Sequence, residues 1–67
     1  MKRYLVKTAA LFKEVRLLYG VGQVKFAALL NISQGQLANI ERGERDPKGS
    51  LVIEVQELRR NFAKNAA

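Results

Sequence analysis

The stretch that decides the fold is QVKFAALLNISQGQLANIERG, residues 23–43. Its first part places three apolar residues on one face of a helix with 3.6 residues per turn: Phe26, Ala27 and Leu30. Asn31 then marks a tight turn, because asparagine tolerates the left-handed backbone conformation better than most residues. Ser33 is a suitable N-cap for a second helix, since its hydroxyl can accept a backbone N–H. The pattern predicts short helices over residues 23–30 and 34–42.

The second of these helices has two unlike faces. Leu37 and Ile40 form an apolar inner face, and the opposite face carries four residues that we expect to be exposed: Gln34, Gly35, Gln36 and Asn39. Two short helices joined by a tight turn form a unit that places its second helix in the major groove of DNA. Amide side chains there can form paired hydrogen bonds with adenine. We predict that these four positions line the base-reading surface; the alternative is that the amides are ordinary solvated groups.

Two longer helical segments flank this unit. The first covers about residues 4–19 and ends before Gly20, a residue type favoured just past a helix end. The second covers about residues 50–64, with Ser50 as its expected N-cap. The sequence contains no strand pattern and no repeat. We therefore expect a single all-α domain over residues 1–67, a compact bundle of four to five short helices.

The charge of the chain favours a polyanionic partner such as double-stranded DNA. Twelve Lys and Arg stand against six Asp and Glu, which gives a net charge of +6. The basic excess lies in residues 1–31, where Lys2 and Arg3 form either an arm that follows DNA or a free basic terminus.

Several functional classes find little support in the composition. The chain has no Cys and no His, so we expect no disulfide, no metal and no cofactor. It also lacks a phosphate-binding glycine loop and paired carboxylates on an apolar face, so we expect no enzyme activity. No apolar run reaches the roughly 20 residues that span a membrane. We expect a cytoplasmic protein that makes no membrane contact.

The last predicted helix carries more apolar residues than one face can hold. A 67-residue domain has a thin core, and such domains often gain stability by oligomerising. Because a helix that is apolar on two sides must bury both, we expect one side to close the core and the other to form a homodimer. The candidate dimer contacts are Val52, Val55 and Phe62. The alternative is that this helix folds back onto Leu11, Val15 and Leu18 of its own chain.

The central stretch resembles the phage repressor and Cro-type (XRE-like) helix-turn-helix family. The resemblance spans residues 12–47, and its motifs are Gln-x-x-Phe-Ala, Ile-Ser and Ile-Glu-Arg-Gly in the family's order and spacing. It implies a fold like that of the lambda repressor. Two positions depart from the family pattern: Gly22 stands where a Ser or Thr commonly caps the first helix of the motif, and Asn31 stands at the usual turn glycine.

The resemblance also implies roles for residues around the motif. Gln23 would touch a DNA phosphate and brace Gln34 across the turn. Arg16 and Glu41 would form the ion pair that ties the first helix to the end of the recognition helix. The other expected phosphate contacts are Lys25, Arg42, Arg45 and Lys48.

These features together predict a transcriptional regulator that reads operator DNA. We expect a dimeric repressor that binds a palindrome, with two recognition helices in successive major grooves. One alternative is an antitoxin that regulates its own synthesis and also binds a toxin protein. Another is a controller protein of a restriction-modification system.

Overall fold

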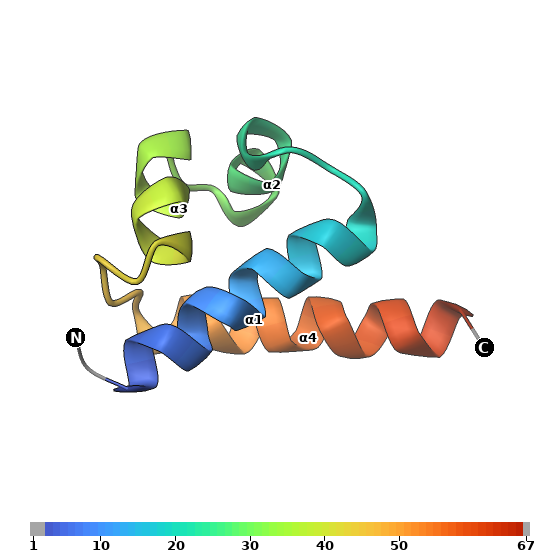
Figure 1. The fold of residues 1–67 in the computed structure, drawn as a ribbon. Helices are drawn as coiled ribbons and strands as arrows, with labels where there is room; N and C mark the ends of the chain where they lie inside the picture. The colour runs from blue at the N-terminus through green and yellow to red at the C-terminus, as the bar shows by residue number, and fades with distance from the viewer. Residues whose placement is uncertain (1–2, 67) are drawn as a thin grey trace.

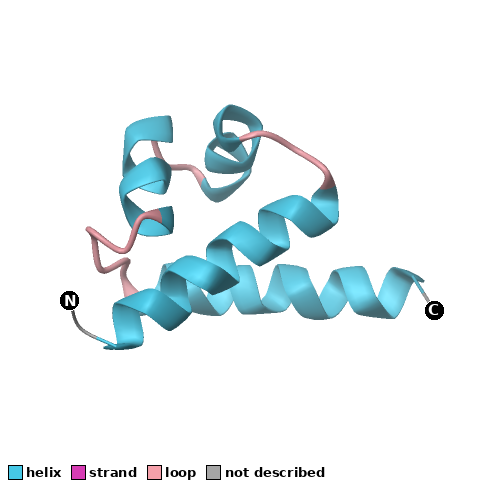
Figure 2. Ribbon diagram, viewed as in Figure 1, coloured by secondary structure: helices cyan, strands magenta, loops and turns pink. Residues whose placement is uncertain are grey.

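The computed structural model describes residues 3–66. Four helices make up this part of the chain (Figure 1): α1 (Arg3–Tyr19), α2 (Gln23–Leu30), α3 (Gln34–Glu41) and α4 (Gly49–Ala66). Residues 3–66 contain helices and loops and no strand (Figure 2). The prediction of an all-α helical bundle is therefore confirmed. Of the two basic residues that open the chain, Lys2 lies outside the described residues and Arg3 begins α1.

The four helices form two layers. The long helices α1 and α4 start at the same end of the molecule and cross at a shallow angle, and the short helices α2 and α3 lie above them (Figure 1). The helix α1 packs against both α3 and α4, and α2 packs against α3 and α4. The two short helices therefore sit on a platform that the long helices provide. None of the helices within residues 3–66 is long and apolar enough to cross a membrane.

The core lies between the two layers and receives side chains from every helix. Its fully buried large side chains are Phe12, Val15, Phe26, Leu37 and Val55. Ala27, Leu30 and Ile40 complete the buried cluster. Burial of each large apolar side chain contributes about 1.5–3 kcal/mol. The sequence pattern placed the inner faces of α2 and α3 correctly, since Phe26, Ala27, Leu30, Leu37 and Ile40 are all buried.

The last helix folds back onto its own chain, so the predicted dimer contact through Val55 is wrong. The Val55 side chain has no exposed surface, because α1 and α4 pack together around it and Val15. Val52 is half-buried against the same cluster. Phe62 is half-buried, with its ring centroid 5.3 Å from that of Tyr19.

Local backbone chemistry fixes the turn between α2 and α3. Asn31 adopts the left-handed conformation, with φ 60° and ψ 41°, and its N–H donates to the Ala28 carbonyl at 3.1 Å. Ser33 then begins α3 with a capping box: its hydroxyl accepts the Gln36 N–H, and the Gln36 side chain accepts the Ser33 N–H. These two interactions satisfy N–H groups that the first turn of a helix leaves unpaired.

Of the remaining two helix caps, the one at the start of α2 agrees with the sequence prediction and the one at the start of α4 does not. Gly22 caps α2 without a side-chain hydrogen bond, as its lack of a hydroxyl requires. The expectation that Ser50 caps α4 is wrong, because α4 begins at Gly49. The Lys48 carbonyl accepts the N–H groups of Leu51 and Val52. Ser50 therefore lies in the first turn of the helix, where its backbone is already helical.

A truncation of Leu37 tests the packing of α3 on the platform. Leu37→Ala should lower the free energy of unfolding by about 2–5 kcal/mol, because it removes buried methyl groups and leaves a cavity. Urea denaturation followed by circular dichroism measures this loss. Leu29→Ala is the matched control, since Leu29 is exposed, and it should change stability by less than about 0.5 kcal/mol. Equal effects of the two variants would contradict the described core.

Candidate nucleic-acid interface

A partly buried ion pair holds three helices together. The Glu41 carboxylate at the end of α3 accepts two hydrogen bonds from Arg16 of α1, at 2.9 Å from Nε and 3.1 Å from Nη2. It also accepts one at 3.2 Å from Nε2 of Gln23, the first residue of α2. The side chains of Arg16 and Glu41 are only 15% and 5% exposed. We call these three residues the Glu41 clamp.

The Glu41 clamp differs in one respect from the sequence expectation. Gln23 braces Glu41, whereas we expected it to brace Gln34 across the turn. Within the described residues, the Gln34 side chain makes no hydrogen bond and is exposed. The Arg16 guanidinium also donates to the Val21 carbonyl at 3.3 Å, in the loop between α1 and α2. Arg16 thus binds the end of α3 through Glu41 and the loop before α2 through the Val21 carbonyl.

The outer face of α3 carries the predicted base-reading residues. Gln34 and Gly35 are exposed, and Gln36 and Asn39 are half-buried. A Cβ built on Gly35 would meet only the Ser33 hydroxyl, at 4.0 Å. No steric contact therefore demands glycine at this position. Because Gly35 has no side chain, another molecule can approach the backbone at the start of α3 closely.

Two of the three amides on this face already have hydrogen-bond partners. The Gln36 side-chain oxygen accepts the Ser33 N–H at 3.2 Å and the Ser33 hydroxyl at 3.4 Å. The Asn39 side-chain oxygen accepts a hydrogen bond from Nη2 of Arg42. We expected neither of these two contacts from the sequence, and both constrain how the amides can bind a base. The capping-box spacing from Ser33 to Gln36 was the signal that could have revealed the first one.

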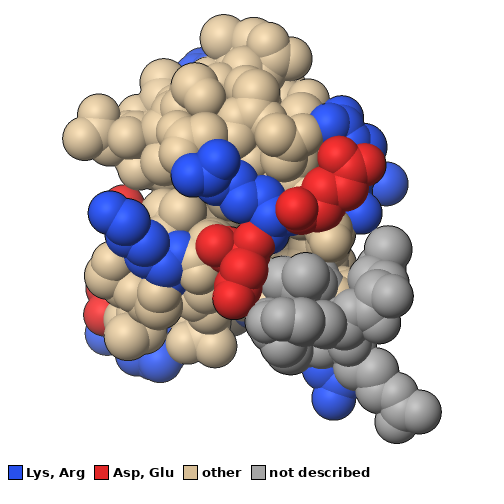
Figure 3. Space-filling model, turned by 90° about the vertical axis from the view of Figure 1, so that its left-hand side faces the viewer, with Lys and Arg blue, Asp and Glu red and all other residues tan. Residues whose placement is uncertain are grey.

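The predicted phosphate contacts lie on α2, at the end of α3 and in the loop that follows. Lys25, Arg42, Arg45 and Lys48 are exposed. Arg42 forms an ion pair with Glu44 at 3.3 Å, and both side chains are more than half exposed. Seen from the end where this loop lies, Lys and Arg mix with Asp and Glu across the middle and lower parts of the molecule, and uncharged side chains dominate at the top (Figure 3).

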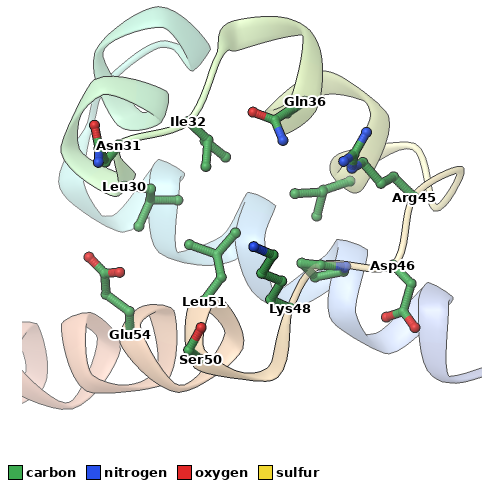
Figure 4. Close-up of a pocket in the computed structure, with 12 residues that line it drawn as sticks. Leu30, Asn31, Ile32, Gln36, Arg45, Asp46, Lys48, Ser50, Leu51 and Glu54 are labelled. Atoms are coloured by element: carbon green, nitrogen blue, oxygen red, sulfur yellow. The ribbon is translucent and has the colours of Figure 1, made fainter.

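A hollow of about 680 Å³ lies between the loop, the α2–α3 turn and the start of α4. Its apolar floor consists of Leu30, Ile32, Ile40 and Leu51, and its lining includes Gln36, Arg45 and Lys48 (Figure 4). The two cations therefore share this hollow with Gln36 and Ile40 of α3. Asp46 and Glu54 also line the hollow, so the positive charge there is partly offset.

Comparisons with known proteins agree with this geometry. A family model described as helix-turn-helix matches residues 12–58, from the middle of α1 to the middle of α4. No curated protein and no solved structure matches the chain.

Breaking the Glu41 clamp on one side tests its weight in the fold. Glu41→Gln should lower the free energy of unfolding by on the order of 3 kcal/mol, since it leaves the Arg16 charge without a partner in a largely buried position. Glu44→Gln removes the other carboxylate that pairs with an arginine in this region. Because that pair is exposed, its loss should cost less than about 1 kcal/mol. Urea denaturation of both variants gives the comparison, and a smaller loss for Glu41→Gln than for Glu44→Gln would contradict the account.

Proposed function

We propose that this protein inserts the outer face of α3 into the major groove of operator DNA. The chain belongs to the Cro/C1-type (XRE-like) helix-turn-helix family, whose members are DNA-binding regulators of transcription. The observation that carries this proposal is the two-sided character of α3. Leu37 and Ile40 are buried on its inner side, and its outer side is polar and accessible. An α-helix with such a face fits the width of the major groove.

The Glu41 clamp supports this docking mode, because it holds both ends of the helix-turn-helix unit. Glu41 anchors the last residue of α3, and Gln23 anchors the first residue of α2 to the same carboxylate. The capping box at Ser33 fixes the start of α3. A reading helix that is held at both ends needs little reordering when it binds, and preorganisation of this kind raises affinity.

We assign the base contacts to the outer face of α3 and the phosphate contacts to residues around that face. We assign base reading to Gln34 and Asn39, with Gln36 and the backbone at Gly35 beside them. We assign phosphate contacts to Gln23 and to the exposed cations Lys25, Arg42, Arg45 and Lys48. Arg42 is paired with Glu44 in the free protein, so it would exchange this exposed carboxylate for a phosphate on binding.

A truncation at position 34 tests the base-reading assignment. Sequences that the wild type prefers are first selected from random DNA, and affinities are then measured at one fixed salt concentration. Gln34→Ala should weaken binding to the selected site by roughly 1–3 kcal/mol and leave binding to random DNA nearly unchanged. Gln56→Ala removes an exposed glutamine of α4 and should change neither. Unchanged specific affinity for Gln34→Ala would refute the assignment.

The salt dependence of binding tests the phosphate contacts. Arg45→Ala should weaken binding to the selected site and to random DNA about equally. It should also reduce the slope of log K against log salt concentration by about 0.9, the contribution of one phosphate contact. Lys64→Ala removes an exposed cation from the last turn of α4 and serves as the control. A slope that responds to Lys64 and not to Arg45 would place the DNA elsewhere on the molecule.

We further propose that the regulator is a dimer that binds a palindrome, and that its dimer contact is the outer face of α1. Val6, Ala10 and Leu17 lie along one line of this helix, and all three are exposed. The line borders a shallow hollow of about 480 Å³ that Leu18 also lines. A second copy of the chain is the partner that would bury this apolar line.

Charge supports a second copy as the occupant of this face. Lys13 and Glu14, three and four residues after Ala10, flank the apolar line on opposite sides. Glu14 pairs within its own chain with Arg59 of α4 at 3.2 Å, and it would exchange this exposed partner for the lysine of the second copy. When two such helices pair in parallel about a two-fold axis, each lysine faces the glutamate of the other chain, as flanking charges do in parallel coiled coils. The start of α1 lies at the same end of the molecule as α3 (Figure 1). An axis along α1 would therefore keep both α3 helices at one end of the dimer.

Charge reversal tests this arrangement. Lys13→Glu alone and Glu14→Lys alone should each weaken the dimer severalfold, since like charges then meet, and the double variant should restore it. Leu17→Glu should abolish the dimer, whereas Ile53→Glu, at a similarly exposed position on α4, should not. Sedimentation equilibrium at micromolar concentration gives the mass. A wild type that sediments only as the 7.5 kDa monomer would overturn the dimer proposal and leave the DNA-binding proposal intact.

A further inference from the structure

The hollow beside the loop that follows α3 has the size of a small-molecule site. Its volume is about 680 Å³, within the roughly 300–1,000 Å³ that is usual for ligand pockets. Three parts of the chain build it: the α2–α3 turn, α3 with the loop after it, and the first turns of α4 (Figure 4). A small molecule in this hollow would therefore touch α3 and the loop with its cations at the same time.

Three hydrogen-bond donors line the hollow without an acceptor of their own. Arg45 and Lys48 form no ion pair with any described residue. The Gln36 oxygen accepts from Ser33, and its NH₂ group has no acceptor within residues 3–66. Figure 4 shows the Lys48 amine pointing into the middle of the hollow, with the Gln36 amide above it. Two cations and a free NH₂ group together suit a carboxylate, whose two oxygens accept several hydrogen bonds.

The two acidic residues of the hollow lie at its edges. In Figure 4 the Asp46 carboxylate points away from the Lys48 amine, and Glu54 lies at the opposite edge, near Asn31. Both acidic side chains are exposed, so water solvates their charges. Neither forms an ion pair with a cation within the described part of the chain. They weaken the positive field in the hollow, but they leave its donors open to an anion.

The apolar side chains of the hollow suit the hydrocarbon body of such an anion. Leu30 and Ile40 close the floor and are almost fully buried. Ile32 and Leu51 are half-buried, so each of them keeps some apolar surface in contact with water. A hydrocarbon chain that covers this surface is favoured by the hydrophobic effect.

We propose that this hollow binds an organic carboxylate with an apolar body, of the class of medium-chain fatty acid anions, and that the bound anion weakens DNA binding. The carboxylate accepts from Arg45, Lys48 and the Gln36 NH₂ group, and the hydrocarbon chain lies on Ile32 and Leu51. Both cations are also our candidates for phosphate contacts, so the anion and DNA compete for them. The regulatory part rests on the proposed function, whereas binding of the anion does not.

Titration of the full chain with octanoate, in the absence of DNA, tests the site. Backbone amide NMR shifts should change most over residues 30–32 and 45–51. Octanamide has the same length and no charge, and it should bind about tenfold more weakly, the effect of losing hydrogen bonds to a charged group. Lys48→Gln should weaken octanoate binding by a similar factor, whereas Lys64→Gln should not. Equal affinities for octanoate and octanamide, or shifts concentrated at Leu17 and Leu18, would overturn the site.

A variant that should gain affinity guards against loss of binding through misfolding. Glu54→Gln removes a negative charge from the edge of the hollow and should tighten octanoate binding severalfold, since like charges repel. Glu57→Gln removes the same charge from an exposed position of α4 that does not line the hollow. Equal tightening by both variants would mean that net charge alone attracts the anion, and it would contradict binding in the hollow.

A competition experiment tests the regulatory part separately. Octanoate at ten times its Kd should weaken binding to a selected DNA site by about tenfold, a coupling of ordinary size. Sodium chloride at the same sodium concentration is the control for ionic strength. Octanoate that binds in the hollow and leaves DNA affinity at the value in sodium chloride would overturn the regulatory part. A protein that selects no DNA sequence would refute the proposed function, and the titration without DNA would still decide whether the site exists.

Discussion

The structure depends most on one carboxylate that is almost entirely removed from water. Glu41 lies at the junction of three helices, and its position is tolerable only because Arg16 and Gln23 supply the hydrogen bonds that water no longer provides. Each of these donors belongs to a different helix. The buried charge therefore imposes a geometric requirement, since its hydrogen bonds form only when α1, α2 and α3 meet in one arrangement.

The orientation of the polar face of α3 follows from this requirement. Leu37 and Ile40 enter the core on one side, and the Glu41 clamp sets the end of the helix against α1. The outer amides are then presented on a helix that is rigid at both ends. The hydrogen bonds of Gln36 and Asn39 add local order to this face, because each of them engages an amide oxygen with a neighbouring residue of the protein. The fold thus fixes the position of the polar face of α3.

The features that could be predicted from the sequence are those with local causes. Asn31 adopts the left-handed conformation that its place between two apolar helices indicated, and Ser33 caps the helix that follows it. The helix boundaries of the central unit agree to within one residue for the same reason. The prediction that Ser50 caps α4 was wrong, because a serine before an apolar run does not show whether the backbone at that residue is already helical.

The features that escaped prediction depend on tertiary packing. Val55 lies on an apolar helix face, and the sequence left open whether this face meets α1 of the same chain or a second copy; the buried Val55 settles the choice for α1. The partner of Gln23 is Glu41, 18 positions away, and the bond follows from how α2 and α3 cross. The exposed apolar line on α1 was likewise hidden, because Leu17 and Ala10 are indistinguishable from core residues until their neighbours are placed.

The central claim is that the outer face of α3 and the loop after it form the DNA surface. The most direct measurement is the change in backbone amide NMR shifts when a selected DNA duplex is added to the labelled protein. We expect the largest changes over residues 33–48, with small changes over residues 59–66 in the second half of α4. Changes concentrated in α4, with α3 unaffected, would contradict it.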